Sequence, residues 1–286
     1  MLFTSDTDRP AIIIDHKGIE KVEQNETTVL LHVSAGENWH QFVLWAIEHD
    51  LGGIENLSLI PGKCGAAPMQ NIGAYGVEIS QVLEYVDVIE RDSFTEKRIP
   101  ASDCGLGYRT SIFKSEAKDK YVIVAVGIRL TKPGFHKINT SYGAINEELQ
   151  SAGVEKPTIR DISDAVISIR QKKLPNPTHL PNAGSFFKNP IVPLSLYEKL
   201  LLEFPSMPSY PVSETTCKVP AGWLIDQRGW KGVSVGDVAV HNRQALVLVN
   251  HGAKSCASIW KLAQMVQQSV LDTYGIDLVP EVNVLP

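Results

Sequence analysis

Residues 55–78 read ENLSLIPGKCGAAPMQNIGAYGVE, and they form the most unusual segment of the chain. Glycines and alanines crowd around Pro61 and Pro68, which disfavours a regular helix or strand. Such a loop can expose backbone N–H groups, so that a flat or phosphorylated ligand can lie directly on the main chain. The alternative is a structural loop packed on itself, because the glycines have neither Walker nor Rossmann spacing.

The patterns on both sides of this segment predict a mixture of strands and helices. Period-two and β-branched runs predict strands over 11–15, 28–35 and 121–130, with a hairpin that turns near residues 91–93. Apolar residues at helical spacing predict a helix within 39–49.

The second half of the chain has clearer helical signals. Apolar faces predict helices over 161–173 and 258–275, the latter with Gly275 as its C-cap. Ser195 and Glu198 have the spacing of a capping box and predict a helix start there. Glycines and prolines within 131–160 indicate a domain connection. The sequence thus predicts a two-domain α+β protein.

Composition and charge exclude several classes of protein. The 286 residues carry a net charge of −5, which gives no global attraction for nucleic acid or an acidic membrane surface. The apolar runs are too short to cross a bilayer, and the N-terminus has no signal-peptide pattern. Four cysteines without CxxC pairs favour a reducing cytosol, and the histidines show no metal-ligand spacing.

Two basic segments contain candidate anion-binding residues. In CGLGYRTSIFK (104–114), Arg109 follows Tyr108 after a flexible run and could bind a carboxylate or phosphate in bidentate fashion. In IRQKKLP (169–175), Arg170, Lys172 and Lys173 form a basic helix end that would serve a diphosphate. In both cases the alternative is a solvated surface charge.

Two further segments place a polar side chain among apolar ones. In PNAGSFFKNP (181–190), Ser185 follows a bendable run and precedes two phenylalanines, so it is either a turn serine or a hydroxyl held against a ligand. In PEVNVLP (280–286), Glu281 is either exposed or drawn into a cleft, where burial would raise its pKa.

Taken in order, eight segments resemble the UDP-N-acetylenolpyruvoylglucosamine reductase family, in its longer form with a tyrosine-bearing insertion. They are ENLSLIPGKCGAAPMQNIGAYGVE, GYRTSIFK, SYGAI, KLPNP, NAGSFFKNP, AGWLIDQ, AVHNRQALVLVN and PEV. The resemblance implies a vanillyl-alcohol-oxidase-type FAD-binding domain over 1–157 and an α+β substrate domain over 158–286. Its last segment, about 278–286, would return to the flavin.

The resemblance also implies an activity. The family reduces the enolpyruvyl ether of UDP-N-acetylglucosamine to UDP-N-acetylmuramate, and NADPH supplies the reducing equivalents through bound FAD. This implies a cytoplasmic, monomeric enzyme of peptidoglycan synthesis, and hence of cell-wall biogenesis, cell shape and cell division. No nucleic acid, membrane or metal partner is expected.

Residue by residue, the resemblance assigns three roles. Ser185 would donate the proton, Arg109 would stabilise the enolate carboxylate and Glu281 would assist either step. The expected substrate-binding residues are Tyr142, Lys173, Asn189 and Tyr108. The expected cofactor-binding residues are Gly62, Gly65, Ala66, Asn71, Gly73, Tyr75 and Gly76.

The chain departs from the family pattern at its N-terminus. Family members begin with a further strand–helix–strand portion and a turn such as GGGSN, whose amides cradle the FAD pyrophosphate. Here Met1 stands at the edge of that turn, so we expect weakened FAD binding. The alternatives are a flavin-free UDP-sugar-binding protein and an FAD-dependent alcohol oxidase of the same superfamily, although the latter would lack NAGSFFKNP and AGWLIDQ.

Overall fold

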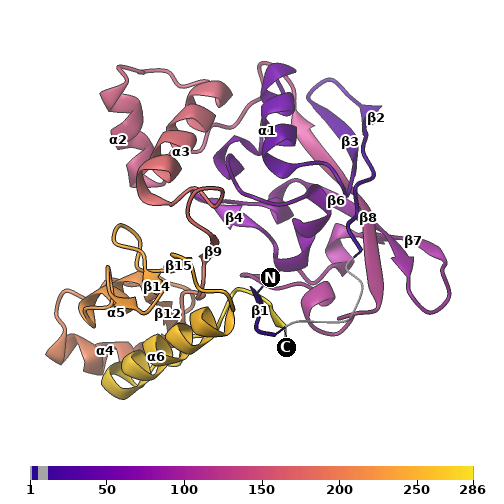
Figure 1. Ribbon diagram of the computed structural model, residues 1–286. Coiled ribbons are helices and arrows are strands. Elements are labelled where there is room, and N and C mark those ends of the chain that lie inside the picture. Colours follow the sequence, from indigo (N-terminus) through magenta and orange to yellow (C-terminus); the bar gives the residue numbers. More distant parts are fainter. Residues whose placement is uncertain (1, 6–11, 286) are drawn as a thin grey trace. The chain divides into compact units, whose positions relative to one another are not determined.

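The computed structural model describes residues 2–5 and 12–285, which form two compact units (Figure 1). One unit comprises residues 12–172; the other comprises residues 173–285 together with residues 2–5, and is called the 173–285 unit. Both combine helices with mainly antiparallel sheets, which confirms the predicted α+β class. The functional boundary after residue 157 stays a prediction, because contacts alone group nearly all of the helix 159–173 with the first unit.

A five-stranded antiparallel sheet organises the 12–172 unit. Its strand order is β2 (Ile19–Gln24), β3 (Thr28–Ser34), β8 (Tyr121–Thr131), β6 (Leu83–Glu90) and β7 (Glu96–Pro100). Helix α1 (Trp39–Glu48) begins at Asn38, whose side chain accepts from the Gln41 N–H, and it buries Trp39 and Phe42 in the main core. The predicted helix, the hairpin at 91–93 and the strand over 121–130 are thus confirmed.

The predicted strand over 11–15 is wrong for the residues that the structure describes. Residues 12–15 lie outside every strand, and Ile12 and Ile13 are 90% and 76% exposed. Residue 11 lies outside the described residues. A β-branched run forms a strand only where a neighbouring strand accepts its hydrogen bonds, and β2 starts only at Ile19.

The glycine-rich segment contains no long element. It is made of short 3₁₀ turns at Glu55–Leu57, Cys64–Ala66 and Pro68–Gln70, followed by the two-residue strands β4 (Gly73–Ala74) and β5 (Val77–Glu78). Helices α2 (Gly143–Ser151) and α3 (Ile159–Lys173) share a separate small core, against which Tyr75 of this segment packs. The loop is therefore held between two cores.

The 173–285 unit has its own core and sheets. One sheet has the order β13 (Ser234–Val235), β14 (Val238–Val240), β15 (Val247–Asn250) and β9 (Asn182–Ser185), and another has β10 (Ile191–Pro193), β12 (Thr216–Lys218) and β11 (Tyr210–Pro211). A parallel pair joins β1 (Leu2–Phe3) to β16 (Val284–Leu285). The remaining helices are α4 (Leu194–Glu203), α5 (Ala221–Gln227) and α6 (Ala257–Tyr274).

Two helix predictions in this unit have different outcomes. The apolar stripe of α6, which includes Ile259 and Tyr274, is buried, and Gly275 ends the helix in the left-handed conformation, as predicted. The capping box at Ser195 is wrong, because α4 begins at Leu194 after Pro193 and has no side-chain cap. Its first N–H donates instead to the Thr215 carbonyl, at 2.8 Å, so a neighbouring loop supplies the missing acceptor.

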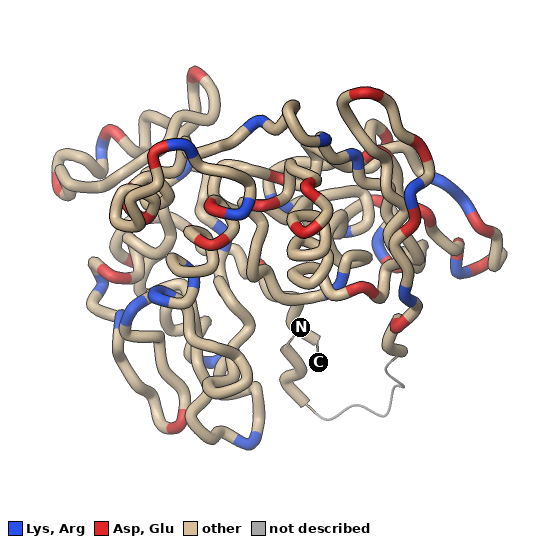
Figure 2. The backbone as a smooth tube through the Cα atoms, turned by 90° about the horizontal axis from the view of Figure 1, so that it is seen from above, with Lys and Arg blue, Asp and Glu red and all other residues tan. Residues whose placement is uncertain are grey.

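Charged residues of both signs are interspersed along the backbone of both units (Figure 2). Within residues 2–5 and 12–285, no helix is both long and apolar enough to cross a membrane. The same residues contain no group of three His, Cys, Asp or Glu side chains that could hold a metal ion.

Candidate functional site

The backbone of the glycine-rich loop is held in unusual conformations. Five residues have positive φ, namely Leu59 (59°), Gly62 (116°), Asn71 (48°), Tyr75 (50°) and Gly76 (81°). A Cβ on Gly62 would meet no atom within 4 Å. Glycine is therefore needed here for its positive φ, and its backbone is open to a ligand. A Cβ on Gly65 would instead lie 2.5 Å from the Cβ of Ala35, so Gly65 permits close packing against the chain after β3.

Hydrogen bonds join this loop to the GYRTSIFK segment. The donors and acceptors are Asn71 Nδ2 to Gly107 O (3.1 Å), Arg109 Nη2 to Gly73 O (2.6 Å), Ser111 Oγ to Met69 O (2.7 Å) and Lys114 Nζ to Gln70 Oε1 (3.1 Å). Arg109 itself has φ 53° and lies 5.5 Å from the Tyr108 ring centroid. The structure thus brings Tyr108 and Arg109 to the glycine-rich loop, as a ligand site at this loop requires.

The Asn71 side chain is fully used within the fold. Its second donor contact is with Glu78 Oε2, at 2.7 Å, and its carbonyl oxygen accepts from the Ser80 N–H. Direct cofactor contact by Asn71 stays a prediction, and its side chain fixes the path of the loop. Ala66 is exposed, and Cys64 is buried, which raises the pKa of its thiol and fits a packing role.

Tyr75 and Tyr142 lie together in the 12–172 unit. Tyr142 is the N-cap residue of α2 and is 46% exposed, and its ring meets that of Tyr75 edge-on at 5.1 Å between centroids. Two asparagines that were not predicted as site residues support them. Asn56 Nδ2 donates to the carbonyls of Tyr75 and Asn139, and Asn139 Nδ2 donates to Gly76 O, at 3.0 to 3.1 Å. An asparagine beside a glycine-rich turn is the only signal that could have indicated them.

The basic end of α3 divides into residues of three kinds. Arg170 is half-buried and hydrogen-bonded to the Tyr75 hydroxyl. Lys172 forms an ion pair with both oxygens of Glu148 at 2.7 Å, and Lys173 is exposed at the last position of the helix. The sequence offered all three cations as equal candidates, because it does not show which way each side chain of a helix end points.

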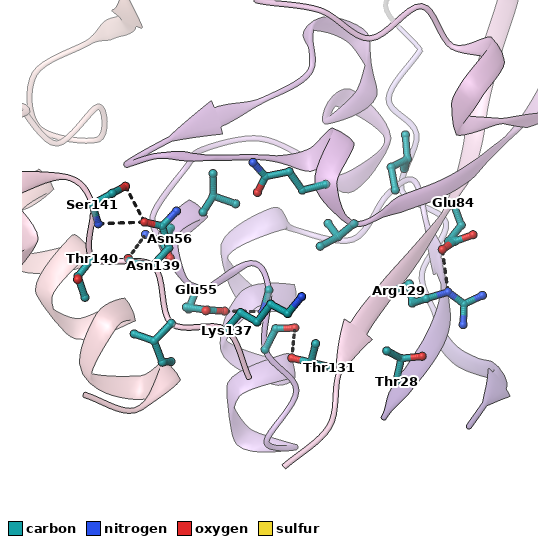
Figure 3. Close-up of a pocket in the computed structure, with 17 residues that line it drawn as sticks. Thr28, Glu55, Asn56, Glu84, Arg129, Thr131, Lys137, Asn139, Thr140 and Ser141 are labelled. Carbon is teal, nitrogen blue, oxygen red and sulfur yellow. Dashed lines mark hydrogen bonds and ion pairs between the residues drawn. The ribbon is translucent and has the colours of Figure 1, made fainter. Parts of the chain in front are cut away.

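A polar pocket of about 760 Å³ lies in the same unit (Figure 3). Glu55, Asn56 and Asn139 line it, and an ion pair between Arg129 Nε and Glu84 Oε1, at 2.7 Å, lies to one side. None of the predicted site residues lines this pocket. Asn56 and Asn139 also bond to the Tyr75 turn, so the pocket adjoins that turn.

In the 173–285 unit, the backbone brings Ser185 and Glu281 close together. Ser185 is exposed at the end of β9, and the next residue, Phe186, accepts a 2.8 Å hydrogen bond from the Glu281 N–H. Phe186 and Phe187 are each 1% exposed, and their rings pack edge to face at 5.2 Å. The two aromatics therefore anchor the strand end, and the serine is left at the surface.

Asn189 holds the start of α5. Its side-chain oxygen accepts a 2.9 Å hydrogen bond from the N–H of Ala221, the first helical residue. This is a structural role, and substrate contact through its amide group stays a prediction. The Glu281 side chain is half-buried, which lies between the two alternatives that the sequence left open.

The predicted residues therefore form two groups, which are described separately. Tyr75 belongs to the glycine-rich loop of the 12–172 unit, where Tyr142 contacts it, and Tyr108 and Arg109 lie on the segment bonded to that loop. Ser185, Glu281 and Asn189 belong to the 173–285 unit, in which α3 delivers Lys173 at its start.

Comparison with known proteins gives consistent results. Residues 2–94 match an FAD binding domain, and residues 176–285 match the C-terminal domain of UDP-N-acetylenolpyruvoylglucosamine reductase. The chain is 49% identical over 285 residues to the protein of that name from Flavobacterium johnsoniae, covering 100% of this chain and 84% of the relative. It is 43% identical to the one from Pseudomonas aeruginosa, covering 99% and 83%.

Among solved structures, the chain resembles the crystal structure of the UDP-N-acetylenolpyruvylglucosamine reductase (MurB) from Thermus caldophilus. The TM-score is 0.61 at 24% sequence identity, and the match covers 89% of this chain and 72% of the other. At that identity the likeness supports the fold.

Proposed function

Because the chain belongs to the UDP-N-acetylenolpyruvoylglucosamine reductase family, we propose that it reduces the enolpyruvyl ether of UDP-N-acetylglucosamine to the lactyl ether, giving UDP-N-acetylmuramate. The reductant is NADPH and the cofactor is FAD. The observation that carries the proposal is that the Glu281 N–H is bonded to the buried Phe186, the residue next to the exposed Ser185. A protein that only bound the sugar nucleotide would not require a hydroxyl and a carboxylate placed in this way.

The residues present fit FAD. The open backbone at Gly62 can accept a flat ring, and Arg170 holds a buried Nε–H that has no partner among the described residues. When bound, FAD supplies hydride transfer from NADPH to the terminal alkene carbon of the substrate. The chain's own task is to hold the loop, to neutralise negative charge and to deliver a proton.

Arg109 is the residue suited to the developing charge. Hydride addition to the alkene pushes negative charge through the α-carbon into the carboxylate, and a preorganised guanidinium there lowers the barrier. The hydrogen bond from Arg109 Nη2 to Gly73 O fixes part of the fork before substrate arrives. We assign it the carboxylate-stabilising role.

Ser185 is the proposed proton donor to the α-carbon. A serine hydroxyl is a weak acid, but a carbon-centred enolate is a strong base, so its placement contributes more than a lowered pKa would. The burial of Phe186 and Phe187 fixes the Ser185 backbone. The N–H of Glu281 is bonded to the next residue, Phe186, and Glu281 is proposed to assist proton transfer from there. Lys173 offers an exposed cation and Tyr142 an exposed hydroxyl, and both suit the UDP diphosphate. Tyr108 and Asn189 are proposed as further substrate contacts.

The proposal extends to the setting of the reaction. UDP-N-acetylmuramate is a peptidoglycan precursor, so we place the protein in cell-wall biogenesis, with consequences for cell shape and division. We further propose that it acts as a monomer in the cytoplasm, on soluble nucleotide substrates.

The test is direct. The purified chain is supplied with FAD, NADPH and the enolpyruvyl substrate, and product is identified by mass spectrometry as the lactyl ether, two hydrogens heavier. Binding of the UDP-sugar without flavin uptake would instead support the flavin-free binding protein. Oxygen consumption with an alcohol and no UDP-sugar turnover would support the oxidase.

A further inference from the structure

Arg170 is a half-buried cation that forms no ion pair with a carboxylate among the described residues. It projects from α3, and its Nε is inaccessible to solvent and has no hydrogen-bond partner within residues 2–5 and 12–285. Burial lowers the pKa of its guanidinium, and the Tyr75 hydroxyl acts in the opposite direction. A buried charge left unpaired is costly, which suggests that an anionic group completes its environment.

The neighbours His40 and Tyr75 are both neutral near neutral pH, so Arg170 carries the positive charge of this group. His40 of α1 accepts a hydrogen bond from the Leu59 N–H at its Nδ1, at 3.0 Å. Burial first, and then the charge of Arg170, lower the pKa of His40, so His40 is neutral near neutral pH. Burial likewise raises the pKa of Tyr75, which stays a neutral hydroxyl.

The hydrogen-bond directions are fixed by chemistry. A guanidinium can only donate, so the Tyr75 oxygen accepts from Arg170 and its own O–H stays available to donate. Tyr75 lies in the glycine-rich loop, in which a Cβ on Gly62 would meet no atom within 4 Å. Lys173 and Tyr142, the residues suited to the substrate diphosphate, are exposed, whereas Arg170 is half-buried.

We propose that Arg170, oriented by Tyr75, stabilises the negative charge that the flavin ring acquires on reduction. Hydride transfer carries two electrons and one proton from NADPH to a neutral ring, which leaves the ring with one negative charge. A fixed cation beside the ring binds this form more tightly than the oxidised form. This inference rests on the proposed function, and it assigns Arg170 a positioning and charge-balancing role.

The experiment measures the midpoint potential of bound FAD, which needs flavin but no substrate turnover. Arg170→Gln is expected to lower the potential by about 30 mV for each tenfold loss in binding of reduced relative to oxidised FAD. Arg170→Lys should retain most of the original potential, and Tyr75→Phe should show a smaller fall. Lys172→Gln, on the same helix but paired with Glu148, is the control and should change nothing.

The outcomes separate this proposal from the function. If Arg170→Gln does not fold, Tyr75→Phe decides, because it keeps the cation and removes only its acceptor. An unchanged potential in every folded variant overturns the inference and leaves the reductase intact. An unchanged potential with a raised dissociation constant for the UDP-sugar overturns it in favour of a substrate-binding role. A parent chain that takes up no FAD overturns both.

Discussion

The main-chain N–H of Glu281 donates a 2.8 Å hydrogen bond to the carbonyl oxygen of Phe186, the residue that follows Ser185. The segment near the C-terminus is thereby fixed to the strand end that carries the proposed proton donor. A second backbone bond, from Lys188 N–H to Val279 O at 2.9 Å, fixes the same register. Two residues almost a hundred positions apart therefore hold one geometry through the main chain.

This relationship separates the role of the Glu281 side chain from that of its backbone. Glu281→Gln keeps the bond to Phe186, so we expect an unchanged melting temperature and a kcat lower by at least about 100-fold. Steady-state kinetics and thermal unfolding measure the two quantities. Glu198→Gln, an exposed change on α4, should alter neither. An undiminished kcat in Glu281→Gln would exclude the carboxylate from the reaction.

Ser185→Ala is expected to affect one half-reaction only. Reduction of the flavin by NADPH should proceed at the parent rate, while reoxidation by the enolpyruvyl substrate should slow by roughly 10²–10⁴-fold, because the proton donor is absent. Stopped-flow absorbance follows both steps. Ser234→Ala, on β13 of the same sheet, is the matched control. Equal slowing of both steps would contradict the proton-donor role.

Arg109→Lys tests the fixed fork of the guanidinium. The lysine keeps the charge but cannot bind Gly73 O and a carboxylate together, so kcat should fall by about 10²–10³-fold with flavin content unchanged. Arg91→Lys, at an exposed arginine that donates to Asp119 O, serves as control. Full activity in Arg109→Lys would mean that charge alone suffices.

Lys173 and Lys172 form a natural pair of test positions. Lys173→Ala should weaken substrate binding by roughly 1.5–3 kcal/mol, seen as a raised KM at unchanged flavin content. Lys172→Ala removes an exposed ion pair with Glu148, so it should cost only about 0.2–1 kcal/mol of stability and leave KM alone. If both variants bind substrate equally well, Lys173 has no part in the diphosphate site.

His40 gives the protein a predicted acid sensitivity. Because burial and Arg170 lower its folded pKa below 6.5, the unfolded chain binds more protons in acid. This contribution to stability is complete above pH 6.5 and is lost as the pH falls through the folded pKa. His241 is shifted in the same direction, so part of the slope should remain without His40.

His40→Asn tests this contribution, because the asparagine oxygen can still accept from the Leu59 N–H. Urea unfolding between about pH 5 and about pH 8 should show a shallower loss of stability in this variant. His179→Asn, at an exposed histidine, should match the parent. A slope identical to that of the parent in His40→Asn would contradict the assignment.

The sequence by itself determined the α+β class, α1, the hairpin at 91–93, the stripe of α6 with its Gly275 cap, and the family. These features depend on local periodicity, local turn chemistry and an ordered set of motifs, all of which a linear reading contains. It failed at residues 12–15 and at Ser195, where the outcome depended on strand partners and on an acceptor supplied by Thr215.

Only the tertiary structure decided which candidates have neighbours. The side-chain oxygens of Asn71 and Asn189 accept backbone N–H groups within the fold. Asn56 and Asn139 support the Tyr75 turn. Arg170 is half-buried, whereas Lys172 and Lys173 are exposed. The physical reason is that hydrogen-bond partners and burial are set by contacts between distant residues. The type of a residue determines which hydrogen bonds it can donate or accept, and the packed fold determines which partner it meets.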